Sequence, residues 1–142
     1  MTYEEIIAGL RALKAEDFEN YVPEQLDQLT DAVRELPSPE RVIPELFALM
    51  ERLAGSDLGS PGPIVHTLER MDYNEELIAS IRRRPTSLTV WMVNRILNSK
   101  IPPERRAFFL ELLASVANDP NARESARENA AHFIEFQSTQ PD

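Results

Sequence analysis

The sequence has no cysteine, and it has only four glycines and one tryptophan among its 142 residues. Without cysteine, disulfides and thiolate metal sites are excluded, which favours a reducing compartment. No apolar run reaches the roughly 18 residues that would indicate a membrane-spanning helix. The opening residues, MTYEEIIAGLRAL, carry two glutamates where a signal peptide carries positive charge. We therefore expect a soluble, cytoplasmic protein.

Glycine and histidine are too scarce for the common catalytic motifs. Nucleophile elbows and phosphate-binding loops need glycines at fixed spacing, and the sequence supplies neither. His66 and His132 lie far apart, with no carboxylate at metal-ligand spacing, and both fall on the polar sides of expected helices. We expect a protein that is not an enzyme, with no catalytic, cofactor or metal site.

Negative charge predominates and is unevenly placed. The formal net charge is -9, which disfavours nucleic acid and anionic membranes as partners. Residues 1–60 hold 13 Asp or Glu against 5 Lys or Arg, a net charge of -8, whereas residues 61–142 hold 11 against 10, a net charge of -1. This acidity is either a set of well-solvated helix faces or a binding surface for a basic partner. The candidate partner-binding residues are Glu16, Asp17, Glu19, Glu24, Asp27 and Asp31.

Apolar residues recur at spacings of three and four throughout, which predicts an all-α single domain over residues 1–142. Prolines stand where helices begin. The expected helices cover 2–14, start near 23 and near 38, cover 63–71, 74–84, 86–100 and 103–118, and end with about 121–136. Pro44 is expected to separate a short turn from the main part of the third helix. This gives about eight short helices.

Helices this short need neighbours, because they are marginally stable alone. Short connections favour antiparallel pairs, and a series of such pairs predicts a stack like those of HEAT and armadillo proteins. The sequence has no exact internal repeat, so an irregular globular bundle is the alternative.

One helix departs from the simple pattern. In SLTVWMVNRILNS, the residues Trp91, Asn94, Arg95 and Asn98 group opposite a broad apolar face formed by Leu88, Met92, Val93, Ile96 and Leu97. Trp and Arg are enriched at binding hot spots, which favours a binding surface. The other interpretation is packing: Trp91 closes a gap between helices, and the amides bond to neighbouring helix ends or to the loop at 59–63.

That loop contains most of the chain's glycine, because Gly55, Gly59 and Gly62 fall within eight residues. We interpret it as a structural joint between an acidic front half and a packed rear half. GSPGPIVHTLER followed by PTSLTVWMVNRILNS resembles the helical immunity proteins of bacterial polymorphic-toxin and contact-dependent growth-inhibition systems. The resemblance covers roughly residues 59–99. The matching positions are Gly59, Pro61, Gly62, Pro63, His66, Trp91, Met92, Asn94, Arg95 and Asn98.

The resemblance implies a protein that binds one toxin domain tightly and blocks it, without catalysis of its own. The cognate toxin domain would be a basic protein such as a nuclease, and the matched positions would mainly fix the fold. Two other hypotheses stay open: a HEAT-like interaction adaptor without a toxin partner, and a ligand pocket formed by His66, Trp91, Asn94 and Arg95. The oligomeric state and the toxin's activity stay open too.

Overall fold

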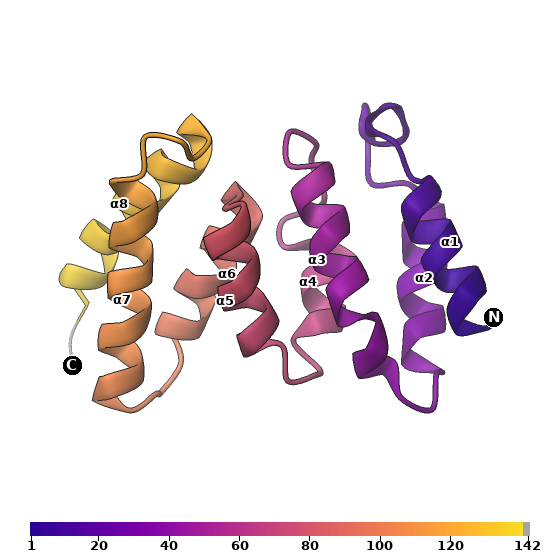
Figure 1. Cartoon of the computed structure of the whole chain (residues 1–142), viewed down its shortest axis with the longest axis horizontal. Helices are drawn as coiled ribbons and strands as arrows, with labels where there is room; N and C mark the ends of the chain where they lie inside the picture. Colours follow the sequence, from indigo (N-terminus) through magenta and orange to yellow (C-terminus); the bar gives the residue numbers. More distant parts are fainter. Residues whose placement is uncertain (141–142) are drawn as a thin grey trace. The chain divides into compact units, whose positions relative to one another are not determined.

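The computed structural model describes residues 1–140. Within this range the chain forms helices joined by loops, and it forms no strand (Figure 1). This confirms the all-α prediction. The elements are α1 (Tyr3–Ala12), the 3₁₀ helix η1 (Ala15–Phe18), α2 (Glu24–Arg34), the 3₁₀ helix η2 (Pro39–Val42), α3 (Ile43–Arg52), α4 (Gly62–Leu68), α5 (Asn74–Arg83), α6 (Ser87–Leu97), α7 (Pro103–Ala117) and α8 (Glu124–Ser138).

The chain forms two compact units, Met1–Ser80 and Ile81–Asp142, and each is described by itself. The boundary falls inside α5. The first unit carries nearly all the negative charge: residues 1–80 hold 17 Asp or Glu and 6 Lys or Arg, a net charge of -11. Residues 81–142 hold 7 acidic and 9 basic residues, a net charge of +2.

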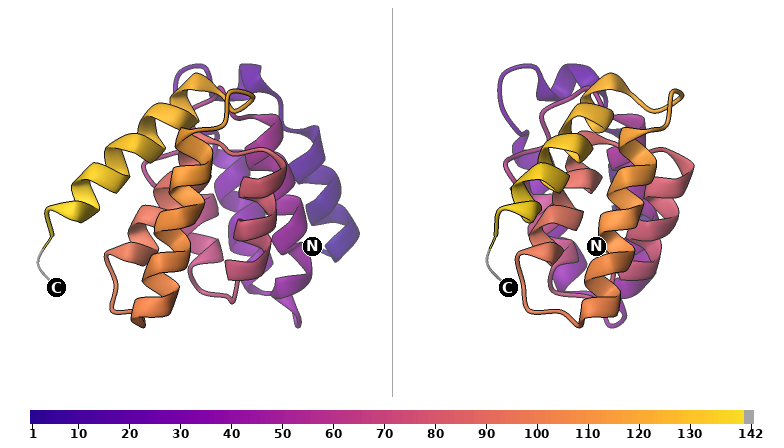
Figure 2. Two further views of the ribbon diagram at one scale, coloured as in Figure 1. Left: turned by 60° about the vertical axis from the view of Figure 1, so that its left-hand side comes forward. Right: turned by 90° about the vertical axis from the view of Figure 1, so that its left-hand side faces the viewer.

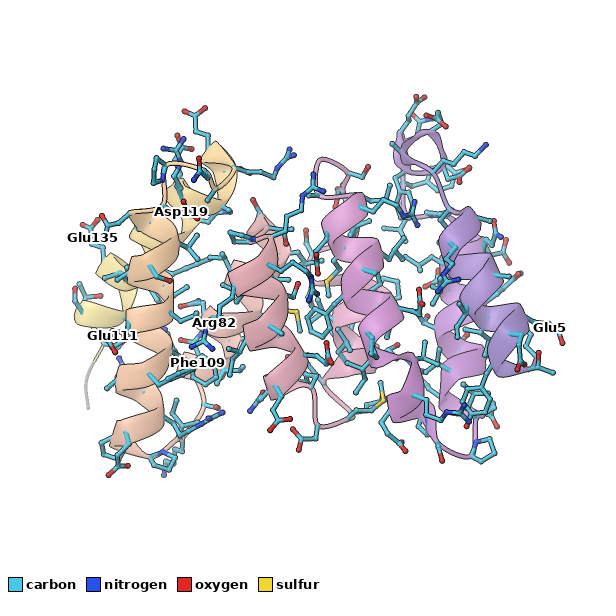
Figure 3. The ribbon with its side chains drawn as sticks, in the orientation of Figure 1. Glu5, Arg82, Phe109, Glu111, Asp119 and Glu135 are labelled. Atoms are coloured by element: carbon cyan, nitrogen blue, oxygen red, sulfur yellow. The ribbon has the colours of Figure 1, made fainter. Side chains whose placement is uncertain are left out.

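Local sequence signals explain where several helices start. Thr2 and Glu5, the latter labelled in Figure 3, form a capping box at α1, and Thr86 with Thr89 forms another at α6. Pro44 lies in the first turn of α3, where its missing N–H is harmless, and the turn before it is the 3₁₀ helix η2. The predicted short turn followed by a main helix is confirmed.

The first unit is built from two layers of helices. Helix α1 packs against α2 and α3, and α2 packs against α4. Consecutive helices run in opposite directions here (Figure 1). This arrangement agrees with the predicted stacking of antiparallel helix pairs. Its deeply buried side chains include Ile6, Leu10, Leu26, Leu46, Phe47, Ile64 and Leu68.

An arginine from α3 completes the end of α1. Arg52 Nη1 donates to the carbonyl of Leu13 at 2.7 Å, and Nη2 donates to the carbonyl of Leu10 at 3.1 Å. The last carbonyls of a helix have no partner within it, so a cation from a neighbouring helix satisfies them and complements the helix dipole. Arg52 therefore ties the two helices together at this end.

The second unit contains α6, α7 and α8, and each of the three packs against the other two. Helix α8 crosses α7 at an angle and diverges from it towards its own C-terminal end (Figure 2). The buried side chains include Val90, Val93, Leu97, Phe109, Leu113, Ala126 and Ala130.

The buried side of α6 differs from the prediction. Asn94 is only 5% exposed, whereas Leu88 and Ile96 of the predicted apolar face are half-buried. Val90 and Thr89 are buried as well. The reason is that α8 packs on α6, so the amide side of the helix faces protein. In α7, Phe109 is buried and Phe108 is half-buried.

Within residues 1–140, no helix is both long enough and apolar enough to cross a bilayer. The longest, α7 and α8, have 15 residues each.

Replacing Arg52 by Met should lower the free energy of unfolding by about 2 kcal/mol, because hydrogen bonds from a charged donor to the end of α1 are lost. The matched control is Arg34→Met, which removes a surface pair with Asp31 at 3.5 Å and should cost less than about 0.5 kcal/mol. Urea unfolding followed by circular dichroism measures both. Equal losses would show that Arg52 does not join α1 to α3.

Candidate functional site

The glycine-rich loop connects α3 to α4 and uses two glycines in the left-handed region. Gly59 has φ +112° and Gly62 has φ +87°, and the Ser60–Pro61 peptide bond between them is cis. The N–H of Gly59 donates to Asp57 Oδ1 at 3.0 Å. Pro63 lies in the first turn of α4. The loop thus turns the chain with two left-handed glycines and contains a hydrogen bond between its own residues.

The position of this joint differs from the prediction. The compact units divide after Ser80, in α5, and the loop lies wholly within the first unit. The reason is that α4 packs on α2, so the chain returns to the first unit after the loop. The expected separation of an acidic front half from a packed rear half at Gly59–Pro63 is therefore wrong.

His66 lies on the polar side of α4, as predicted. Its side chain is 57% exposed, and Nδ1 lies 3.9 Å from Glu69 Oε1. His132 is exposed on α8. His66 belongs to the first unit, whereas Trp91, Asn94 and Arg95 belong to the second. Trp91 and Arg95 are half-buried, Met92 is buried and Asn98 is exposed.

Asn94 of α6 and Asn98, the residue that follows this helix, both contact a glutamine from the last turn of α8. Gln137 Nε2 donates to Asn94 Oδ1 at 2.7 Å and to Asn98 Oδ1 at 2.8 Å. Gln137 is 3% exposed and Asn94 is 5% exposed, so this pair is nearly closed to solvent, whereas Asn98 is exposed. Buried amides need partners, and these satisfy one another. The packing interpretation of Asn94 and Asn98 is confirmed, with Gln137 as a partner that the sequence analysis did not name.

The acidic candidates gather around the α1–α2 connection. Glu16 and Asp17 lie in η1, Glu19 follows it, and Glu24, Asp27 and Asp31 share one side of α2. All six are exposed. We call these six residues the acidic surface.

Most of these carboxylates form no hydrogen bond or ion pair with the rest of the described chain. Asp17 Oδ2 accepts from the N–H of Lys14 at 2.8 Å, and Asp31 lies 3.5 Å from Arg34. Within residues 1–140, Glu16, Glu19, Glu24 and Asp27 make no side-chain hydrogen bond or ion pair. Four charges are therefore left to solvent or to a partner.

The same region holds an aromatic side chain that sequence reasoning missed. Tyr21 is 75% exposed and borders a surface hollow of about 330 Å³, together with Glu16, Glu19 and Glu24. An exposed tyrosine between carboxylates has the composition of an interface anchor with a charged rim. Its position in a turn with no apolar periodicity gave no signal in the sequence.

Two other features were not predicted. Glu40, Asp72, Glu75 and Glu76 line a second acidic hollow of about 290 Å³ in the first unit. In the second unit, the ring centroid of Phe108 lies 5.8 Å from Arg82 Cζ and 5.9 Å from Arg105 Cζ. Figure 3 labels Arg82 and also Phe109, the residue that follows Phe108 in the sequence. The contact of Arg82 with Phe108 joins residues distant in sequence, so no local pattern reveals it, whereas Arg105 and Phe108 lie three residues apart in α7.

In the part of the chain that the structure describes, no group of three or more His, Asp or Glu side chains is placed to hold a metal ion. A shifted pKa appears at Arg11, whose pKa is raised by its hydrogen bond to the Glu45 carboxylate and by that charge. This pair joins α1 to α3 and lies outside the acidic surface.

Comparison of the chain with protein-family models, with curated proteins and with solved structures finds no match.

Substituting alanine at the two left-handed glycines should give unequal losses of stability. A Cβ at Gly59 would lie 2.3 Å from Gly62 Cα, whereas a Cβ at Gly62 meets no atom within 4 Å. Gly62→Ala should therefore cost about 1 to 2 kcal/mol from backbone conformation alone, and Gly59→Ala clearly more because the backbone must also move. Urea unfolding of both variants tests this, and a larger loss at Gly62 would contradict the loop geometry.

Proposed function

We propose that this chain is an immunity protein that binds and neutralises a cognate bacterial toxin domain, a basic protein such as a nuclease, in a stoichiometric complex. The observation that supports the proposal most is the acidic surface, where three carboxylates without partners in the described chain, those of Glu16, Glu19 and Glu24, border one hollow with the exposed side chain of Tyr21. The proposed role is inhibition by binding, with no catalysis by this chain.

The chemistry of the acidic surface suits a basic protein partner. Tyr21 supplies a large, rigid contact area that loses little conformational entropy on binding. The carboxylates of Glu16, Glu19 and Glu24 stand around it, where Lys and Arg of a partner would find acceptors. Because these carboxylates bind nothing within the described chain, a partner can engage them without breaking contacts of the fold.

The wider charge distribution supports the same partner. The net charge of -11 over residues 1–80 would attract a basic protein from a distance and raise the association rate. The polyanionic alternatives, nucleic acid and anionic membranes, would be repelled by this unit.

The resemblance to immunity proteins adds an independent argument. It covers residues 59–99, where the glycines of the loop and the amides of α6 have structural roles. The acidic surface lies outside that segment. A common scaffold with a separate partner-specific surface is what an inhibitor matched to one toxin requires.

A HEAT-like adaptor without a toxin partner is the alternative. The stacking of α1 with α3 and of α2 with α4 favours it, because stacked helix pairs are frequent scaffolds for protein binding. The two functions predict different results with the toxin encoded directly upstream. An immunity protein binds that toxin and removes its toxicity, whereas an adaptor does not protect cells from it.

Charge reversal at Glu19 and Glu24 should slow association with the toxin domain encoded upstream by about tenfold or more at low salt, with much less difference at about 0.3 M salt. The double substitution Glu128→Lys with Glu135→Lys is the matched control, because it changes the net charge equally from exposed positions on α8, of which Figure 3 labels Glu135. Surface plasmon resonance gives the rate constants.

Two further variants locate the binding surface. Tyr21→Ala should speed dissociation by about thirtyfold, the effect of a hot-spot residue worth about 2 kcal/mol. Charge reversal at Glu40 and Glu75 tests the second acidic hollow. A large effect there with none at Glu19, Glu24 or Tyr21 would move the interface away from the acidic surface, and an unchanged complex in every variant would contradict the electrostatic part of the proposal.

A further inference from the structure

A pocket of about 730 Å³ lies in the second unit, where the end of α6, the start of α7 and the end of α8 meet. In this unit, α8 diverges from α7 towards its C-terminal end (Figure 2). The walls of the pocket include the apolar side chains of Leu97, Ile101 and Pro103 and the polar ones of Lys100, Arg106 and Gln137. This volume is within the range of small-molecule sites. We call it the Arg106 pocket.

Arg106 lines this pocket, and no residue of the described range 1–140 is its counter-ion. Its Nη1 donates to the carbonyl of Leu97 at 3.3 Å, and its Nη2 donates to Gln137 at 3.3 Å to the carbonyl and 3.2 Å to Oε1. All three acceptors are neutral. Within residues 1–140, no carboxylate pairs with this half-buried guanidinium. A partly desolvated charge without an opposite charge favours binding an anion.

The guanidinium is also held in place. The Gln137 amide that accepts from Arg106 is itself fixed, because its Nε2 donates to Asn94 and Asn98. The donors of Arg106 are thus oriented before any ligand arrives. Such preorganisation lowers the entropy lost on binding.

The lining specifies the chemistry of the ligand. Among residues 1–140, no acidic side chain borders the pocket, and Lys100 adds a second cation. A guanidinium matches a carboxylate in shape and charge, and the apolar walls suit a hydrocarbon body. We propose that the Arg106 pocket binds a carboxylate carried by an apolar group, a function separate from toxin binding at the acidic surface.

Titration of the protein with sodium octanoate, followed by ¹H–¹⁵N NMR, tests this site. We expect saturable shifts in residues 97–106 and 137–140. Octanol has the same hydrocarbon chain without the charge and should bind at least about tenfold more weakly than octanoate. Inorganic phosphate has the charge without a hydrocarbon chain and should also bind at least about tenfold more weakly. Octanol binding as tightly as octanoate would overturn the carboxylate assignment. Equal binding of phosphate, or no saturable shifts with any carboxylate probe, would overturn it too.

A second probe distinguishes two sources of the carboxylate. N-acetyl-Ala-Ala-Leu presents a peptide C-terminus, and its C-terminal amide is the matched uncharged form. Tighter binding of this peptide than of octanoate assigns the pocket to peptide C-termini, and the reverse assigns it to small carboxylic acids. Both results support the site, whereas equal binding of the acid and amide peptides, with no octanoate binding, contradicts it.

Lys100→Gln tests the pocket without disturbing the helix ends, because Lys100 is exposed. We expect carboxylate binding about three- to tenfold weaker. Arg123→Gln removes one exposed charge outside the pocket and should change binding less than twofold. Equal effects of the two substitutions would show that the ligand responds to net charge only. Arg106→Gln should abolish binding, with circular dichroism to check that the variant is folded.

Discussion

The carbonyl groups at the ends of short helices are the constraint on which both units depend. A helix of ten or eleven residues leaves its last carbonyls without partners, and several such ends lie inside the protein. In each unit an arginine from another helix supplies the donors: Arg52 at the end of α1, and Arg106 at the ends of α6 and α8. These contacts fix where neighbouring helices lie.

The two arginines also position the two surfaces with proposed functions. Arg52 binds the carbonyl of Leu13, and the segment that carries Glu16, Glu19 and Tyr21 begins directly after it, so the acidic surface extends from an anchored helix end. Arg106 joins helices that diverge, and the pocket lies at that junction. The same need for donors at helix ends therefore underlies both the proposed protein-binding surface in one unit and the proposed ligand pocket in the other.

Periodicity and proline positions predicted the helices well, because helix formation depends on neighbours in sequence. Pro44 predicted the break between η2 and α3, and both histidines lie on polar faces as expected. The sequence did not reveal the partner of Asn94, because Gln137 lies 43 positions away. Nor did it reveal Tyr21 or Arg106, whose exposure and contacts depend on how the helices pack.

The most direct test of the proposed function is coexpression with the protein encoded directly upstream, followed by purification of any complex and an assay of cell survival. An immunity protein predicts a one-to-one complex and survival of cells that die when the upstream protein is expressed alone. Survival should fall when Glu19, Glu24 and Tyr21 are replaced together. If the upstream protein forms no complex and cells receive no protection, the immunity function is contradicted, and the adaptor function becomes the better explanation.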